Sequence, residues 1–104
     1  MRTEYEMNLC FMREHSAATL FHDEVESEVQ ALFADRGFWY CDYKTTEQAE
    51  MVVVEVKGKN QFLDEDGALR FLQQHGSDRF WSWLQGYHIL VEQLYGGCRN
   101  CNDQ

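Results

Sequence analysis

The chain has 104 residues, 18 of them acidic and 9 basic, so its formal net charge at pH 7 is −9. Hydrophobic residues make up 44% and aromatic residues 14%, enough apolar side chains to offset the entropy of folding, which excludes an acidic disordered tail. The negative field also argues against direct binding to nucleic acid or to an anionic membrane. The length predicts a single domain, for which we expect residues 1–97, followed by a polar C-terminal tail at 98–104.

The first predicted element is a strand over residues 4–14. Apolar side chains alternate with polar ones along it and place Tyr5, Met7, Leu9 and Phe11 on one side. A period of two is typical of a strand with one face on the core.

A helix is predicted next, at about residues 17–36, with Ser16 as its N-cap and Gly37 at its end. Apolar residues at spacings of three and four predict its buried stripe: Phe21, Val25, Val29, Leu32 and Phe33. Acidic residues take up much of the remaining surface: Asp23, Glu24, Glu26, Glu28 and Asp35. Within this segment only Arg36 offers compensation, so we expect the acids to repel one another and to face a partner.

Two further strands are predicted at residues 38–43, which are aromatic, and at residues 51–56, which are β-branched. The segment 44–50 between them is polar, so the pair is predicted to form an antiparallel hairpin with a long connection. Gly58 is expected to end the second strand.

Two helices are predicted to complete the chain. The first covers about residues 64–75 and begins with three acids, Asp64, Glu65 and Asp66, at the positive end of the helix dipole. The second starts near Ser77 and continues to about Tyr95. The element order β-α-β-β-α-α predicts an α+β fold in which a small three-stranded antiparallel or mixed sheet packs against three helices.

The last predicted helix carries a second stripe that includes Trp81, His88 and Tyr95, on a face separate from its core face. Tryptophan and tyrosine are enriched at binding hot spots, so this stripe is a candidate partner-binding surface. The alternative is that another element of the protein simply covers it.

The cysteines and histidines indicate no catalytic or cofactor site. Cys98 and Cys101 have CxxC spacing and are weak candidates for zinc, because a structural site needs four ligands and no second pair with ligand spacing exists. Cys10 and Cys41 lie in predicted strands, where cysteines commonly pack as small apolar residues. We expect no metal, no cofactor and no enzymatic activity, although a small enzyme or ligand-binding domain that uses cysteine and histidine groups remains a third hypothesis.

The leading functional hypothesis is a small acidic inhibitor that binds and blocks a basic nucleic-acid-handling protein, such as a nuclease, a CRISPR effector or a toxin. Phage anti-CRISPR and anti-restriction proteins, immunity proteins and antitoxins belong to this class. Its carboxylates would imitate phosphates, as a nucleic-acid mimic does. The expected contact residues are Asp23, Glu24, Glu26, Glu28, Asp35, Asp64, Glu65, Asp66, Trp81, His88 and Tyr95.

The alternative hypothesis is a homo-oligomeric structural or adaptor module, with a homodimer formed through the aromatic helix face. A cytoplasmic location is expected, because acids stand near the N-terminus where a signal peptide has a basic region and because the sequence contains no long apolar run.

Overall fold

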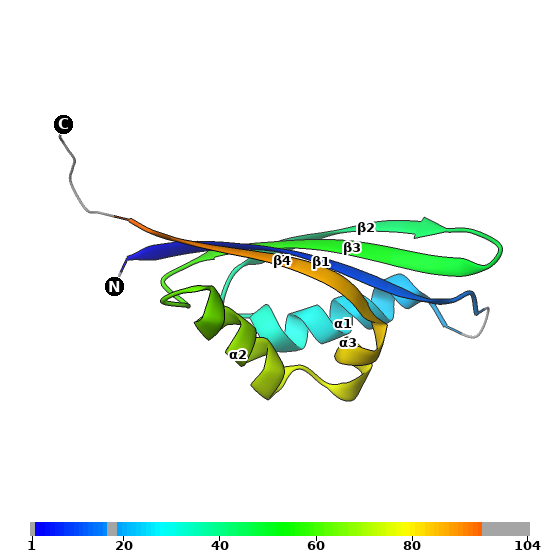
Figure 1. The fold of residues 1–104 in the computed structure, drawn as a ribbon. Helices are drawn as coiled ribbons and strands as arrows, with labels where there is room; N and C mark the ends of the chain where they lie inside the picture. Colours follow the sequence, from blue (N-terminus) through cyan, green and yellow to red (C-terminus); the bar gives the residue numbers. More distant parts are fainter. Residues whose placement is uncertain (1, 17–18, 95–104) are drawn as a thin grey trace.

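The computed structural model describes residues 2–16 and 19–94, and its elements form one sheet and one helical layer (Figure 1). In chain order the elements are β1 (Thr3–Glu14), α1 (Phe21–Phe33), β2 (Phe38–Thr45), β3 (Ala49–Lys59), α2 (Glu65–His75), α3 (Asp78–Trp83) and β4 (Leu84–Gln93). Within this part of the chain, no helix is both long and apolar enough to span a membrane.

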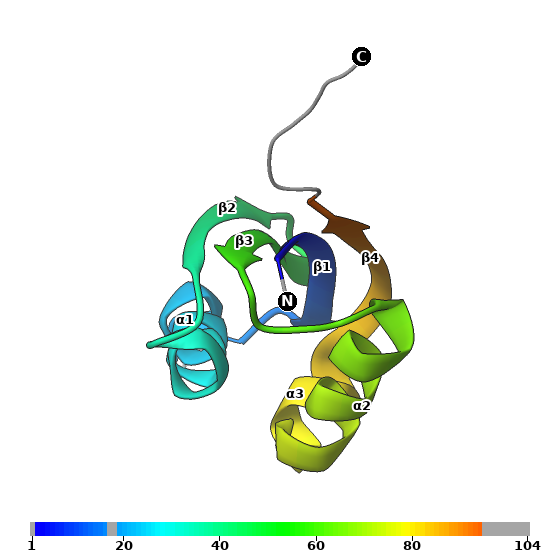
Figure 2. The same cartoon turned by 90° about the vertical axis from the view of Figure 1, so that its left-hand side faces the viewer.

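The sheet has four strands in the order β2-β3-β1-β4, and every neighbouring pair is antiparallel. β1 and β2 therefore run parallel on either side of β3, and β3 and β4 run parallel on either side of β1. Each parallel pair is joined through the helical layer, which makes two interlocked split β-α-β units, the connectivity of the ferredoxin-like fold. All three helices lie on one face of the sheet, with α1 under one half and α2 and α3 under the other (Figure 2).

The α+β class is confirmed, but the prediction of three strands and of a long last helix is wrong. α3 ends at Trp83, and Leu84–Gln93 continues as β4. The apolar residues in this segment fit a helical spacing, yet Tyr87, Ile89 and Val91 are aromatic or β-branched residues that also suit a strand. Pairing with β1 decides between the two, because it satisfies the backbone groups along the edge that β1 would otherwise leave open.

The antiparallel hairpin of β2 and β3 is confirmed, but its connection is short, at residues 46–48, because both strands extend into the polar segment that was expected to join them. α1 is also shorter than predicted. It begins at Phe21 after Leu20, whose side chain makes no capping bond. Ser16, the predicted N-cap, instead donates its backbone N–H to the Glu50 carboxylate at 3.1 Å. Asp64 caps α2 as the sequence suggests, accepting a 2.8 Å hydrogen bond from the backbone N–H of Gly67.

The core lies between the sheet and the helices, and it contains the apolar side chains that the alternation in β1 and the α1 stripe predict. Its buried residues include Tyr5, Met7, Leu9, Phe11, Phe21, Val25, Val29, Leu32, Phe33, Val52, Val54, Val56, Leu72 and Phe80. Phe11 of β1 and Phe80 of α3 make an edge-to-face contact with their ring centroids 5.3 Å apart. This contact joins the short helix to the centre of the sheet.

At one end of the sheet, the chain that follows α1 presses directly on β3. A Cβ atom on Gly58 would lie 2.3 Å from the carbonyl oxygen of Arg36 and 2.5 Å from the Tyr5 ring, so only glycine fits there. The Tyr5 hydroxyl donates to that same Arg36 carbonyl at 2.9 Å, and burial raises the pKa of Tyr5 to about 12. This close approach places the start of β2 beside the end of β3.

Candidate functional site

Two of the acidic residues predicted to face a partner, Glu24 and Glu28, are half-buried and bound by arginines of the protein itself. Arg13 of β1 and Arg79 of α3 each contact a Glu24 carboxylate oxygen at 2.8 Å. Glu28 accepts a hydrogen bond from the Ser77 hydroxyl at 2.5 Å and lies 3.6 Å from Nε of Arg79. The expectation that the α1 acids lack compensation is therefore wrong for these two, because their cations come from other elements.

The other acids of the first helical segment are not held in this way. Asp23 is exposed, and its ion-pair contact is with the neighbouring His22, at 3.6 Å. In residues 2–16 and 19–94, neither Glu26 nor Asp35 lies within ion-pair distance of a lysine or arginine. These three carboxylates remain available at the surface of the helical layer.

The acids at the start of α2 have separate roles. Asp64 is the N-cap, and Glu65 reaches across to β4, where its Oε2 atom accepts the backbone N–H of Val91 at 2.8 Å. Asp66 is exposed in the first turn, where its charge suits the helix dipole. Asp64 and Glu65 therefore stabilise the local fold, whereas the Asp66 side chain makes no hydrogen bond or ion pair with residues 2–16 or 19–94.

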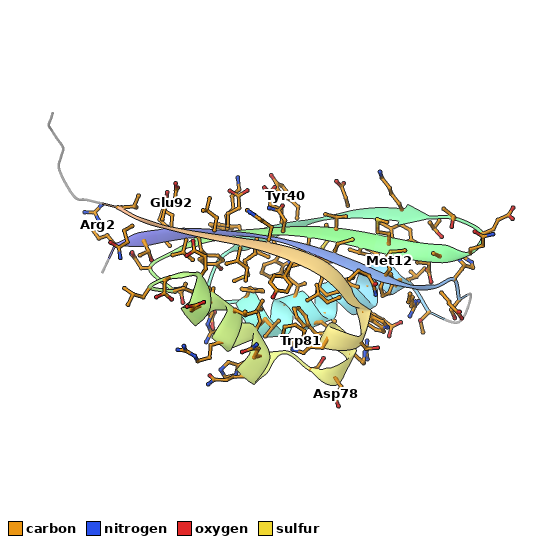
Figure 3. All side chains as sticks on the ribbon, viewed as in Figure 1. Arg2, Met12, Tyr40, Asp78, Trp81 and Glu92 are labelled. Atoms are coloured by element: carbon orange, nitrogen blue, oxygen red, sulfur yellow. The ribbon has the colours of Figure 1, made fainter. Side chains whose placement is uncertain are left out.

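The predicted aromatic stripe of Trp81, His88 and Tyr95 does not form a single surface, which is a correction that follows from β4. Trp81 lies in α3, where its indole N–H donates to the Leu72 carbonyl at 3.2 Å. His88 lies in β4, where it pairs with Asn8 of β1, and its side chain is on the face of the sheet away from the helices. Figure 3 shows Trp81 among the helices, while Tyr40 and Glu92 project from the other face. Tyr95 lies outside the described residues.

A buried carboxylate that the sequence analysis missed, Glu50, lies at the start of β3. It is only 2% exposed, and Nε of Arg13 donates to its Oε2 atom at 3.1 Å. The Ser16 backbone N–H and the Tyr43 hydroxyl donate to the same carboxylate at 3.1 and 3.2 Å. The alternation along β3 could have predicted its burial, because Glu50 lies two residues before Val52 and so on the same, core-facing side of the strand.

Arg13 is the centre of a network that we call the arginine–glutamate network: Arg13, Glu24, Glu28, Glu50 and Arg79. The Arg13 guanidinium also lies 4.7 Å from the centroid of the Phe21 ring, and Arg79 lies 4.8 Å from that of Trp83. Nη2 of Arg13 donates to the backbone carbonyl of Thr19 at 3.0 Å. The Arg13 donors are therefore satisfied within the fold, and the network stabilises the joint between β1, β3, α1 and α3.

The network should make stability depend on pH in the acid range. The hydrogen bond from Thr19, together with Arg13, holds the pKa of Glu24 below its ordinary value of 4.5. Burial acts to raise the pKa of Glu50, but the hydrogen bonds from Arg13, Ser16 and Tyr43 outweigh it and lower that pKa as well. A carboxyl whose pKa is depressed by folding stabilises the protein above its unfolded pKa, and this contribution is lost as the pH falls through the folded pKa.

We therefore expect Glu24→Gln to destabilise the protein at pH 7 and the deficit relative to wild type to shrink as the pH falls below about 4.5. Urea unfolding at a series of pH values measures this difference. Glu47→Gln, which removes an exposed carboxylate in the β2–β3 connection, is the matched control and should leave stability nearly unchanged at pH 7. A Glu24→Gln deficit that stays constant down to pH 3 would contradict the assignment.

The second surface of interest is the face of the sheet opposite the helices, which we call the open face. In the part of the chain that the structure describes, no helix or strand packs against it (Figures 1 and 3). It presents Phe38, Tyr40, Asp42 and Lys44 of β2; Met51, Val53, Glu55, Lys57 and Lys59 of β3; Glu4, Glu6, Asn8, Cys10 and Met12 of β1; and Gly86, His88, Leu90 and Glu92 of β4. Phe38 and Tyr40 are 84% and 67% exposed, which is unusual for aromatic side chains and indicates an interaction surface.

A groove of about 790 Å³ lies at the end of the open face where α1 leads into β2. Phe38 and Leu90 contribute apolar side chains to it, and Glu6, Lys57 and Arg36 contribute charges of both signs. The groove is therefore a mixed surface suited to protein contacts rather than a closed pocket for a small molecule.

The two cysteines that the structure describes are free and lie on different faces of the sheet. Burial, together with the nearby Glu26 and Asp42 carboxylates, raises the pKa of Cys41 from 9.0 to about 11, which makes it a poor nucleophile. Residues 2–16 and 19–94 contain no group of three or more side chains placed to hold a metal ion. Cys98 and Cys101, the weak zinc candidates, lie outside these ranges.

Comparison with protein-family models, with curated proteins and with solved structures finds no significant match for this chain. A shared ferredoxin-like connectivity does not supply a function, because this fold supports many.

Proposed function

We propose that this protein is a small acidic inhibitor that binds a basic nucleic-acid-handling protein and blocks its nucleic-acid site. One observation carries the proposal: Arg13 and Arg79 are already bound by acids of the protein itself, while Asp23, Glu26 and Asp35 are left without a lysine or arginine partner among the described residues. The helical layer therefore presents excess negative charge to a partner.

The ion pairs within the protein support a smaller set of proposed contact residues. Glu24 and Glu28 bind Arg13 and Arg79 and so have a structural role. The residues proposed to contact the partner directly are Asp23, Glu26, Asp35 and, on α2, Asp66. Because the acids of α1 project from a helix packed firmly on the core, they keep their spacing without a partner present, which reduces the ordering that binding requires.

Binding would begin with long-range attraction between this acidic layer and a lysine- and arginine-rich site. Such steering raises association above the roughly 10⁵–10⁶ M⁻¹s⁻¹ of uncharged pairs. Leu20, which is 66% exposed just before α1, offers an apolar contact beside Asp23 that would slow dissociation. The carboxylates would then occupy the cations that otherwise hold phosphates.

The test starts with a pull-down of the tagged wild-type protein from lysate of its native host. We expect capture of a basic nucleic-acid enzyme at low salt and its release at high salt, because screening weakens attraction between opposite charges. The triple variant Asp23→Asn, Glu26→Gln, Asp35→Asn should lose at least about tenfold in affinity for the captured enzyme, chiefly through slower association.

The matched control is the triple variant Glu14→Gln, Asp42→Asn, Glu47→Gln, which removes the same charge from the hairpin end of the sheet. Its affinity should stay within about threefold of wild type, since more distant charges are largely screened. If both triple variants lose affinity equally, net charge alone explains binding and the three named acids have no special role. If neither variant loses affinity, binding does not depend on these charges.

A further inference from the structure

The open face has a pattern of charges and apolar groups that is complementary to itself. Because the strands are antiparallel and in register, its side chains form rows across the sheet, each read here from β2 to β4. Successive rows are Lys59, Glu4, Glu92; then Phe38, Lys57, Glu6, Leu90; then Tyr40, Glu55, Asn8, His88; then Asp42, Val53, Cys10, Gly86; then Lys44, Met51, Met12. In the first two rows the lysine comes from β3 and the central acid from β1.

From this pattern we propose that the open face binds the open face of a second copy of this chain. In the dimer the two-fold axis runs parallel to the strands, between β3 and β1, so that β3 of one copy lies over β1 of the other. Each row then faces the same row of the partner, read in reverse. Lys57 meets the partner's Glu6, Glu6 meets the partner's Lys57, and Phe38 meets the partner's Leu90.

The central pairs of three further rows are also compatible in the same arrangement. Lys59 faces the partner's Glu4 at one end, and Met51 faces the partner's Met12 at the other. In the centre, Val53 faces the partner's Cys10, so apolar groups meet apolar groups. A two-fold axis perpendicular to the strands would instead place the lysine and glutamate row over the methionine row, and this mismatch selects the parallel axis.

The open face is large enough for a stable interface. Four strands about 4.8 Å apart and five rows about 6.8 Å apart give roughly 600 Å² of plane, close to the patch of about 800 Å² that each partner typically contributes. Two sheets packed face to face are about 10 Å apart, which leaves room for side chains such as Phe38 to interdigitate. This dimer leaves the acidic helical layer pointing outward, so the inference goes beyond the proposed inhibitor function and does not depend on it.

The test uses charge reversals at Glu6 and Lys57, which face each other across the proposed interface. These residues are also cross-strand neighbours within one copy, so urea unfolding of each variant at low concentration controls for effects on the monomer. Wild type should sediment as a dimer of the 12.3 kDa chain at micromolar concentration. Glu6→Lys alone places a lysine opposite the partner's Lys57, and Lys57→Glu alone places a glutamate opposite the partner's Glu6. Each variant should therefore dimerise at least about tenfold more weakly. Mixed in equal amounts, the two variants should form a heterodimer. The Glu6→Lys chain has lysine at both positions, and the Lys57→Glu chain has glutamate at both, so opposite charges face each other again.

Matched controls with the same charge changes are Glu47→Lys and Arg70→Glu, both exposed and both away from the open face. Each control should dimerise as wild type does. A monomeric wild type, single variants that still dimerise fully, or a mixture that fails to associate would each overturn the proposal. Loss of dimerisation in the control variants would overturn it too, since net charge alone would then govern association.

Discussion

Replacing Arg13 with methionine is expected to destabilise the protein by about 3–5 kcal/mol, because the change leaves a buried carboxylate without its cation. Glu50 is 2% exposed and forms an ion pair with Arg13. Against a total stability of about 5–15 kcal/mol, a loss of this size brings the domain close to unfolding. Urea unfolding monitored by tryptophan fluorescence measures it.

Two further variants separate an orphaned charge from a simple loss of packing. The double variant Arg13→Met, Glu50→Leu should recover part of the stability that Arg13→Met loses, since it removes the buried charge along with its partner. Arg70→Met, at an exposed position of α2, should change stability by less than about 0.5 kcal/mol. If the double variant proves no more stable than Arg13→Met, the burial of Glu50 is not the cause.

Replacing Phe80 with alanine is expected to destabilise the protein by about 3–5 kcal/mol. The side chain is fully buried, and its ring contacts those of Phe11 and Trp81. No neighbouring element can move freely into the space, because α3 is only six residues long and is held between α2 and β4. The loss should appear as a lower urea midpoint.

Phe38→Ala provides the matched control, because it deletes the same side chain at a position that is 84% exposed. Its effect on the stability of the monomer should be within about 0.5 kcal/mol. Both variants should be unfolded at the same low protein concentration, so that dimerisation does not add to the measured stability. Similar losses at the two positions would contradict the description of the core and the open face.

Much of the fold could be predicted from local patterns. The alternation in β1 identifies the residues that face the core, and the stripe from Phe21 to Phe33 identifies the buried side of α1, because both signals depend only on the geometry of one element. β4 could not be predicted in this way. Its apolar spacing suits a helix or a strand, and pairing with β1, a segment about 80 residues away, decides between them.

The candidate site was harder to predict than the fold. Asp23 and Asp35 are exposed, as the charge pattern suggests, but the partners of Glu24 come from β1 and α3, at separations that no sequence pattern reveals. The open face was missed because its rows combine residues from four strands. Strand order and register create that surface, and neither follows from composition or periodicity alone.

The contact between Glu65 and β4 has a consequence for how copies of this protein can associate. β4 is an edge strand, and the backbone donors along such an edge can recruit a strand from another molecule and start fibrous aggregation. The Glu65 carboxylate already accepts the N–H of Val91, and it places a negative charge where an incoming strand would bring its own carbonyl groups. Growth of the sheet past β4 is thereby discouraged at this position.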